Sequence, residues 1–183
     1  MDADEISDWS DRYDTVYNED LRKTEERIHK TINEQQYLTR DELLEIVRWK
    51  LDGMPGRRGG NVDRVEKVPD EFVQRVTEAA LLVDDPVIQL KTLKSVPGIG
   101  PATGTVVLTF YDPENYGIGD RYILDEFFGE SRTMRVTDYP KILEELRNRN
   151  PSDFDLRTVE KAYYQKYRVE NGVGNFSEIS RTE

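Results

Sequence analysis

Residues 86–111 consist of two apolar segments joined by the turn VPGIGPATG (96–104), and this turn limits the fold more than any other feature. A glycine-rich loop that binds a nucleotide phosphate follows a strand and has the pattern GxGxxG, or GxxxxGK followed by Ser or Thr. The glycines of this turn are spaced GxGxxxG, and the segment before them carries apolar residues at helical intervals. The sequence therefore predicts two helices joined by a tight turn.

The rest of the chain also carries helical patterns, which predict an all-α fold, a compact multi-helix domain. Apolar and aromatic residues recur from Trp9 through Ile32 at helical spacing, so much of 8–33 is expected to pack against the core. Thr39 and Glu42 form a capping box. Helices are expected at 40–51, 70–82, 86–96, 101–111 and 121–128, with two more beginning at Pro140 and Asp155. The glycine-rich segment 52–64 is predicted to be a loop.

The length of 183 residues suits one domain. We expect an acidic N-terminal segment (1–20) that is partly helical or loose, a helical domain (21–172) that contains the hairpin 86–111, and a tail (173–183). The protein is expected to be a monomer.

The composition excludes several kinds of site. The chain has no cysteine and one histidine, so disulfides, thiolate nucleophiles, cysteine-held zinc and iron–sulfur clusters are excluded. No apolar run approaches the roughly twenty residues that a bilayer span needs, and the acidic N-terminus is unlike a signal peptide. We therefore expect no membrane association and a location in the cytoplasm, at the nucleoid.

The net charge of −11 at first argues against a nucleic-acid partner, because phosphate attraction supplies most non-specific affinity for DNA. However, residues 1–20 carry eight acidic side chains against one arginine, so the excess is concentrated at one end. The balance of acids and arginine resembles that of proteins from salt-loving archaea, where salt screens surface repulsion. DNA therefore stays a candidate partner, and the acidic N-terminus could contact a protein partner.

The turn resembles the helix–hairpin–helix motif, because each position of VPGIGPATG fits that pattern. The resemblance implies non-specific binding of a DNA backbone, with phosphate contacts at Gly98, Gly100, Ala102 and Thr103. The physical basis is a helix N-terminus whose free N–H groups face outward and attract an anion. An ordinary αα-hairpin that needs glycines only for its bend is the alternative.

The same resemblance implies a monovalent cation, K⁺ or Na⁺, at the hairpin. It would be held by the backbone carbonyls of Lys94, Val96 and Ile99. No other cofactor is expected to be required.

Residues 35–170 resemble the helix–hairpin–helix DNA glycosylases related to endonuclease III and the alkylpurine glycosylases, and most of all a set of small glycosylase-like proteins. In the endonuclease III pattern the catalytic aspartate lies eighteen residues beyond the position that holds a lysine in bifunctional members. Here that position is Ala102, and the aspartate position is Asp120 in IGDRYILDEF. The resemblance therefore implies a monofunctional glycosylase without lyase activity. As an alternative, Asp120 is only an N-cap of the following helix. The chain also departs from the family pattern at Asp125, where a basic residue is usual.

Further residues are candidates for contacts with DNA. Trp49 and Tyr122 could form the pocket of an extruded base, which needs an aromatic surface, although a tryptophan is more often part of the core. Lys50, Arg57 and Arg58 could contact phosphates, with solvated surface charges as the alternative.

Three functions are consistent with these patterns. The first is a DNA-binding, monofunctional DNA N-glycosylase that removes a damaged or modified base during base excision repair. The second is a catalytically silent helix–hairpin–helix module that only binds DNA, and the third is a helical protein-interaction domain.

Overall fold

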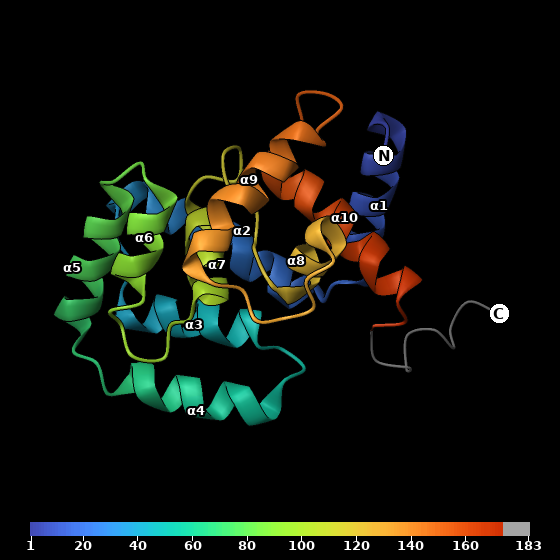
Figure 1. The fold of residues 1–183 in the computed structure, drawn as a ribbon. Helices are drawn as coiled ribbons and strands as arrows, with labels where there is room; N and C mark the ends of the chain where they lie inside the picture. Colours follow the sequence, from blue (N-terminus) through green and yellow to red (C-terminus); the bar gives the residue numbers. More distant parts are fainter. Residues whose placement is uncertain (174–183) are drawn as a thin grey trace.

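The structure, a computed structural model, describes residues 1–173, apart from the side chains of Pro55 and Arg57. Within that range the regular elements are ten α-helices and one short 3-10 turn, which confirms the predicted all-α class (Figure 1). The elements are α1 (Ala3–Val16), α2 (Glu19–Gln35), α3 (Arg40–Lys50), α4 (Pro55–Glu66), α5 (Asp70–Leu81), α6 (Pro86–Leu93), α7 (Pro101–Tyr111), α8 (Arg121–Phe128), η1 (Val136–Asp138), α9 (Tyr139–Asn148) and α10 (Leu156–Glu170). The predicted tail lies outside the described residues, except for Val173. Across residues 1–173 we find no helix of the length and apolarity that crossing a bilayer requires.

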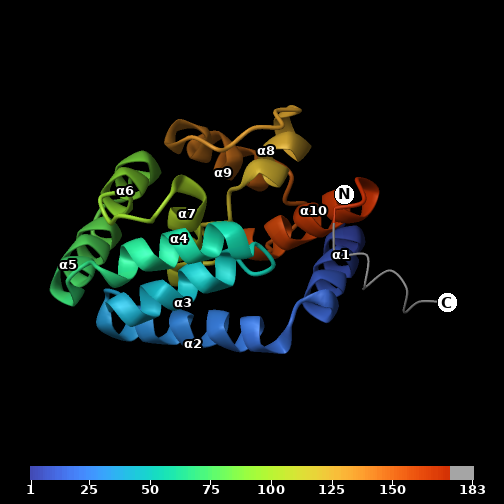
Figure 2. The same cartoon turned by 90° about the horizontal axis from the view of Figure 1, so that it is seen from below.

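Helix α7 lies at the centre of the molecule. Figures 1 and 2 show α3–α6 on one side and α1, α8, α9 and α10 on the other, with α7 between them. All residues of α7 from Thr103 to Phe110 are buried. The β-branched residues of this helix would also suit a strand, but the Gly-Pro start and burial on all sides favour a helix.

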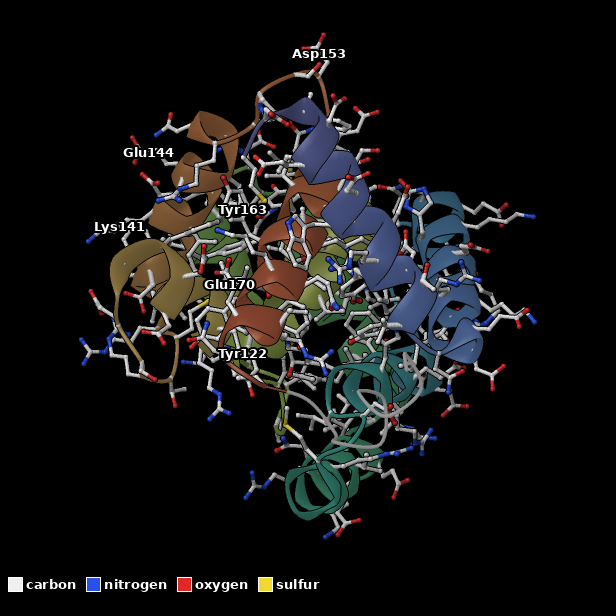
Figure 3. The ribbon with its side chains drawn as sticks, turned by 90° about the vertical axis from the view of Figure 1, so that its right-hand side faces the viewer. Tyr122, Lys141, Glu144, Asp153, Tyr163 and Glu170 are labelled. Atoms are coloured by element: carbon white, nitrogen blue, oxygen red, sulfur yellow. The ribbon has the colours of Figure 1, made fainter. Side chains whose placement is uncertain are left out.

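The N-terminal aromatic stripe is divided between two helices. The chain leaves the helical conformation at Tyr17, and the Asn18 side chain then caps α2 by accepting a hydrogen bond from the Asp20 amide. Helix α1 lies beside α10 (Figure 3) and buries Ile6 and Tyr13. Residues 1–20 were expected to be partly helical or loose. Residues 3–16 form helix α1 and are therefore not loose.

The segment predicted as a glycine-rich loop is helix α4, so that prediction was wrong. Pro55 occupies the first turn, where its missing N–H has no cost. Val65 is fully buried and Val62 packs against the core, which anchors the helix. Three glycines cost this helix about 1 kcal/mol each relative to alanine, but burial of its apolar face offsets that cost.

The hairpin turn between α6 and α7 depends on close packing at one glycine. Gly98 has a φ of +98°, and a Cβ added there would come within 2.7 Å of the Asn61 carbonyl oxygen in α4. The Ile99 amide closes the turn by donating to the Val96 carbonyl at 3.1 Å. By contrast, Gly100 has an ordinary extended conformation with no atom near the position of a Cβ.

We therefore expect Gly98→Ala to lower the free energy of unfolding by about 1–3 kcal/mol, because alanine is strained at positive φ and collides with α4. Gly100→Ala is the matched control and should cost about 0.5 kcal/mol, the loss of a glycine N-cap. Urea denaturation of both variants measures the difference. Equal destabilisation by the two substitutions would contradict the packing of α4 on the turn.

Candidate functional site

A cavity of about 870 Å³ opens between the end of α3, the start of α7, the start of α8 and α10. This volume is in the range of ligand sites, which run from about 300 to 1,000 Å³. The cavity brings together sequence-predicted site residues from three separate segments. Those residues are Trp49, Lys50, Ala102, Thr103, Asp120 and Tyr122.

Asp120 uses its two carboxylate oxygens for different contacts. Oδ1 accepts hydrogen bonds from the amides of Tyr122 (2.9 Å) and Ile123 (3.1 Å), and so caps α8. Oδ2 accepts a hydrogen bond from Nζ of Lys50 at 3.0 Å. The residue is 8% exposed and lines the cavity, so the capping role and access to the cavity coexist.

The strand-like segment before Asp120 is fixed to its surroundings at two points. The Gly119 amide donates to Oγ1 of Thr105 in α7 at 3.0 Å, and the Tyr139 hydroxyl donates to the Gly117 carbonyl at 2.9 Å. Both glycines lie against neighbouring side chains, since a Cβ at Gly119 would approach Sδ of Met134 within 2.7 Å. The tight packing holds Asp120 next to Thr105, in the second turn of α7.

The N-terminus of α7 is free of side-chain caps. Gly100 is the N-cap, and no side chain of the described residues accepts a hydrogen bond from the first amides. Gly100, Pro101 and Ala102 are half-buried, whereas Thr103 is buried at 6% exposure. Free amides at an accessible helix start are the usual protein site for an anion.

Trp49 and Tyr122 form aromatic walls of the cavity. Trp49 is 3% exposed, donates from Nε1 to the Leu21 carbonyl at 3.0 Å, and packs edge-to-face against Phe110. It therefore belongs to the core and to the cavity wall at once. Tyr122 lies beside the C-terminal half of α10 (Figure 3), where its ring contacts those of Tyr164 and Tyr167.

The predicted phosphate contacts on α4 lie elsewhere. Arg58 does not line the cavity and forms an ion pair with Asp52 at 3.8 Å. The Arg57 side chain lies outside the described part of the chain.

Two cavity residues that sequence reasoning missed, Arg157 and Glu160, lie on α10. Their spacing of three residues places them on one face of the helix, where Tyr164 also lines the cavity, but the same spacing is typical of a solvated polar face. Because the burial of Arg157 and Glu160 depends on α1 and on the segment at Gly117, no local signal in α10 identifies them.

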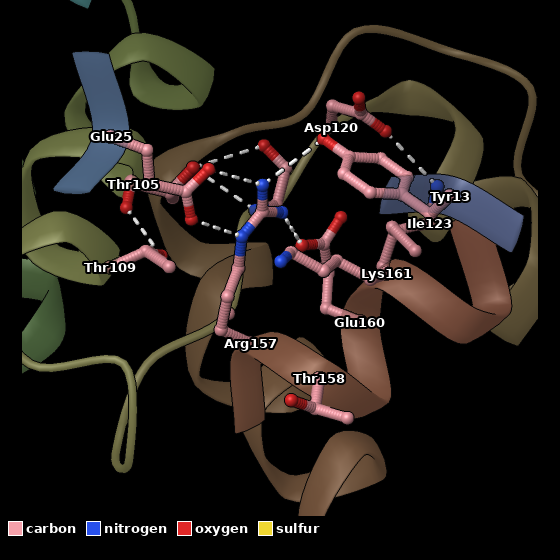
Figure 4. Close-up of polar contacts among 12 residues, drawn as sticks. Tyr13, Glu25, Thr105, Thr109, Asp120, Ile123, Arg157, Thr158, Glu160 and Lys161 are labelled. Atoms are coloured by element: carbon pink, nitrogen blue, oxygen red, sulfur yellow. Dashed lines mark hydrogen bonds and ion pairs between the residues drawn. The ribbon is translucent and has the colours of Figure 1, made fainter. Parts of the chain in front are cut away.

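Arg157 is 3% exposed and holds several side chains together (Figure 4). Its Nε and one terminal nitrogen donate to the two oxygens of Glu25 at 2.8 and 3.0 Å. The guanidinium also donates to the Tyr13 hydroxyl at 3.0 Å and to Oε2 of Glu160. These contacts connect α1 and α2 to α10 at the wall of the cavity.

The two glutamates beside Arg157 have pKa values shifted in opposite directions. Burial alone would raise the pKa of Glu25, but the charge and hydrogen bonds of Arg157 lower it below its usual 4.5. Burial raises the pKa of Glu160, with a contribution from the negative charge of Asp120, despite the positive charges of Arg157 and Lys50. The cavity therefore contains one carboxyl group, Glu160, that burial makes a weaker acid than an exposed glutamate.

Comparisons with protein-family models, with curated proteins and with solved structures gave no match to this chain. Among the described residues, no three histidine, aspartate or glutamate side chains are grouped so as to hold a metal ion. The site is therefore interpreted from its own geometry.

We expect Glu25→Gln to lower the free energy of unfolding by about 3 kcal/mol at pH 7, because it leaves a buried guanidinium short of one partner. A carboxyl group with a lowered pKa in the folded state stabilises the protein above its usual pKa, and this contribution is lost as the pH falls. The difference between wild type and variant should therefore shrink below about pH 4.5.

Urea denaturation between pH 3 and 7 measures this difference. Glu19→Gln, which removes an exposed ion pair with Lys23, is the control and should cost about 0.5 kcal/mol or less. If the two substitutions lower the free energy of unfolding equally, Glu25 is not needed to compensate the buried charge of Arg157.

Proposed function

We propose that this protein is a DNA-binding, monofunctional DNA N-glycosylase that removes a damaged or modified base with the help of Asp120. The observation that carries the proposal is the position of Asp120 on a cavity that also reaches Ala102 and Thr103 in the first turn of α7. In this proposal the uncapped amides of α7 bind a DNA phosphate, and the adjoining cavity receives the extruded nucleotide.

The proposed chemistry needs a negative charge beneath the sugar. Breaking an N-glycosidic bond develops positive charge on C1′ and the ring oxygen, and an ionised carboxylate stabilises that charge. Asp120 has one oxygen, Oδ2, directed to Lys50 rather than to the backbone, and this oxygen is the one proposed to face the sugar. Ala102 offers no amine at the hairpin, so the proposed enzyme releases the base without cleaving the strand.

The proposed binding contacts come from three parts of the cavity. Trp49 and Tyr122 supply aromatic surface for the extruded base. Lys50 supplies a cation for the DNA backbone when its contact to Asp120 opens. For the implied K⁺ or Na⁺, the Val96 carbonyl already accepts one hydrogen bond from Ile99 and keeps a second lone pair for a cation.

The ion pair between Lys50 and Asp120 also favours a second candidate, a DNA-binding module without catalytic activity. A carboxylate 3.0 Å from an ammonium group is already neutralised by the protein and has less charge to offer an oxocarbenium ion. In that case the pair would only stabilise the junction of α3 and α8.

We expect Asp120→Asn to reduce base release by about 10²–10³-fold, the usual cost of removing one transition-state charge contact. Asparagine caps a helix about as well as aspartate, so the fold should be kept. Asp85→Asn is the matched control, because Asp85 caps α6 with two similar hydrogen bonds to amides but does not line the cavity. Its rate should equal that of the wild type.

The measurement uses duplexes that each contain one uracil, hypoxanthine, 8-oxoguanine or 7-methylguanine, in dilute buffer and in molar KCl. Base release is measured as strand cleavage that appears only after treatment with alkali. DNA binding without release from any duplex would establish the second candidate. Binding of no duplex at either salt concentration would reject both candidates in favour of a protein-interaction domain.

We expect Gly100→Asp to weaken DNA binding about tenfold or more while raising the stability of the protein by about 0.5–1 kcal/mol. The new carboxylate would cap the free amides of α7 and repel a phosphate from them. Gly100 has the extended conformation of an N-cap and open space for a side chain. Titration of a labelled duplex and thermal unfolding measure the two effects, with Gly100→Ala as the uncharged control. A stabilised variant with unchanged affinity would show that DNA does not use these amides.

A further inference from the structure

The cavity contains a second carboxyl group, Glu160, whose surroundings differ from those of Asp120. Asp120 accepts hydrogen bonds from two backbone amides and from Nζ of Lys50. Glu160 is 2% exposed and comes from the middle of α10. Its Oε2 accepts a hydrogen bond from Arg157, and Oε1 has no hydrogen-bond partner among the described residues. One oxygen of Glu160 is therefore held in place while the other is available.

The packing around Glu160 fixes its position on the cavity. A Cβ added at Gly117 would come within 3.1 Å of the Glu160 Cβ, so the segment that leads to Asp120 lies directly against Glu160. Both carboxyl groups line the same cavity. They therefore face one space from two rigid elements, α10 and the start of α8.

The charges around Glu160 do not balance if every group is ionised. The cluster has three carboxyl groups, Asp120, Glu25 and Glu160, around the two cations Arg157 and Lys50. Lys161 adds a third cation near Glu25, but its own ion pair with Asp14 balances that charge. Glu25 takes two hydrogen bonds from Arg157 and Asp120 takes the one from Lys50, so Glu160 is the least compensated of the three. The titratable and charged groups that face it are Tyr13, Glu25, Lys50, Asp120, Tyr139, Arg157 and Tyr164. A proton on Glu160 makes this buried cluster neutral.

We propose that Glu160 is the general acid of this cavity and donates its Oε1 proton to the leaving base, so that the site is built for bases that are neutral in DNA. The inference rests on the proposed glycosylase function. An acid and a charge-stabilising carboxylate in one site need different surroundings. Here Asp120 contacts an ammonium group and two amides, whereas Glu160 is buried with one oxygen unpartnered among the described residues. Burial raises the pKa of Glu160, which supports the assignment.

The proposed step is hydrolysis of the C1′–N bond with Glu160 as the acid. The C1′–N bond breaks, its electron pair goes to the base, and the base takes the proton of Glu160. The carboxylate of Asp120 stabilises the positive charge on the sugar. Water adds its oxygen to C1′, and the proton that it loses returns to the Glu160 carboxylate. The products are a neutral free base, which carries the proton from Glu160 on nitrogen, and an abasic site with a C1′ hydroxyl group.

The proposal separates two classes of substrate. A neutral base such as hypoxanthine leaves slowly unless it is protonated, whereas 7-methylguanine is already cationic and leaves without an acid. We expect Glu160→Gln to reduce release of hypoxanthine by at least about 10²-fold, the usual contribution of a general acid, and to change release of 7-methylguanine little. Glutamine keeps a side-chain oxygen that can accept the hydrogen bond from Arg157. Glu25→Gln is the matched control, because it also alters the Arg157 cluster but lies outside this cavity, and it should not discriminate between the bases.

The pH dependence supplies a second readout. Because the protonated form is active, release of hypoxanthine by the wild type should fall as the pH rises through the pKa of Glu160. The Gln variant should lack this limb. Equal losses on both bases, or an unchanged pH profile, would overturn the role of Glu160 while leaving the glycosylase intact. Release of the cationic base alone by the wild type would overturn it as well. No release of any base by the wild type would overturn the proposed function and this inference together.

A measurement without DNA keeps the inference open to test if the Gln variant does not fold. In wild-type protein labelled with ¹³C at the glutamate side-chain carboxyl carbon, the Glu160 resonance should titrate above the usual glutamate pKa of 4.5. Because Glu25 also contacts Arg157, the Glu160 resonance is assigned by through-bond correlation with its own backbone. A midpoint at or below 4.5 would exclude Glu160 as an acid near neutral pH.

Discussion

The guanidinium of Arg157 is the contact on which this side of the structure depends. It is almost fully buried, and moving a charge out of water costs several kcal/mol unless partners compensate it. The partners come from three helices, Tyr13 in α1, Glu25 in α2 and Glu160 in α10 itself. Because one planar group must satisfy all three, the helices have little freedom to shift relative to one another. The floor of the cavity is therefore rigid, and the acidic first helix forms part of its wall.

A second constraint places Asp120 over that floor. Asp120 begins α8, and its Oδ1 is committed to two amides of that helix. The preceding residue is tied to Thr105 in α7, so a shift of α7 moves the carboxylate with it. The two oxygens of one side chain thus have separate tasks: Oδ1 fixes the position, and Oδ2 remains for Lys50 or a substrate. This division explains how a residue can be a structural cap and still be available for chemistry.

The sequence predicts the helices well where local signals decide them. Two such signals are the capping box at Thr39, which begins α3, and the N-cap Asp120, which begins α8. Both depend on residues close in sequence, and both are observed. Helix α4 was missed because its glycines favour a loop, while the burial of Val65 that stabilises the helix comes from α3 and the hairpin turn. Glu160 was missed for the same kind of reason. Its spacing on α10 is also typical of a solvated residue, and packing of α1 and of the segment at Gly117, both distant in sequence, makes it buried.

In the proposed function, the acidity of the chain determines which contacts with DNA can contribute to the affinity. The Debye length is about 10 Å at 0.1 M salt and about 3 Å at 1 M, so a net charge of −11 repels a duplex strongly only in dilute salt. Contacts at hydrogen-bond distance are screened much less. The free amides of α7 act at that distance, and the side chains of Lys50, Arg121 and Arg168 add positive charge on the cavity itself. If the protein binds DNA as proposed, it depends on short-range contacts at the hairpin rather than on a basic surface. Its affinity for DNA should then fall less with salt than that of a basic DNA-binding protein.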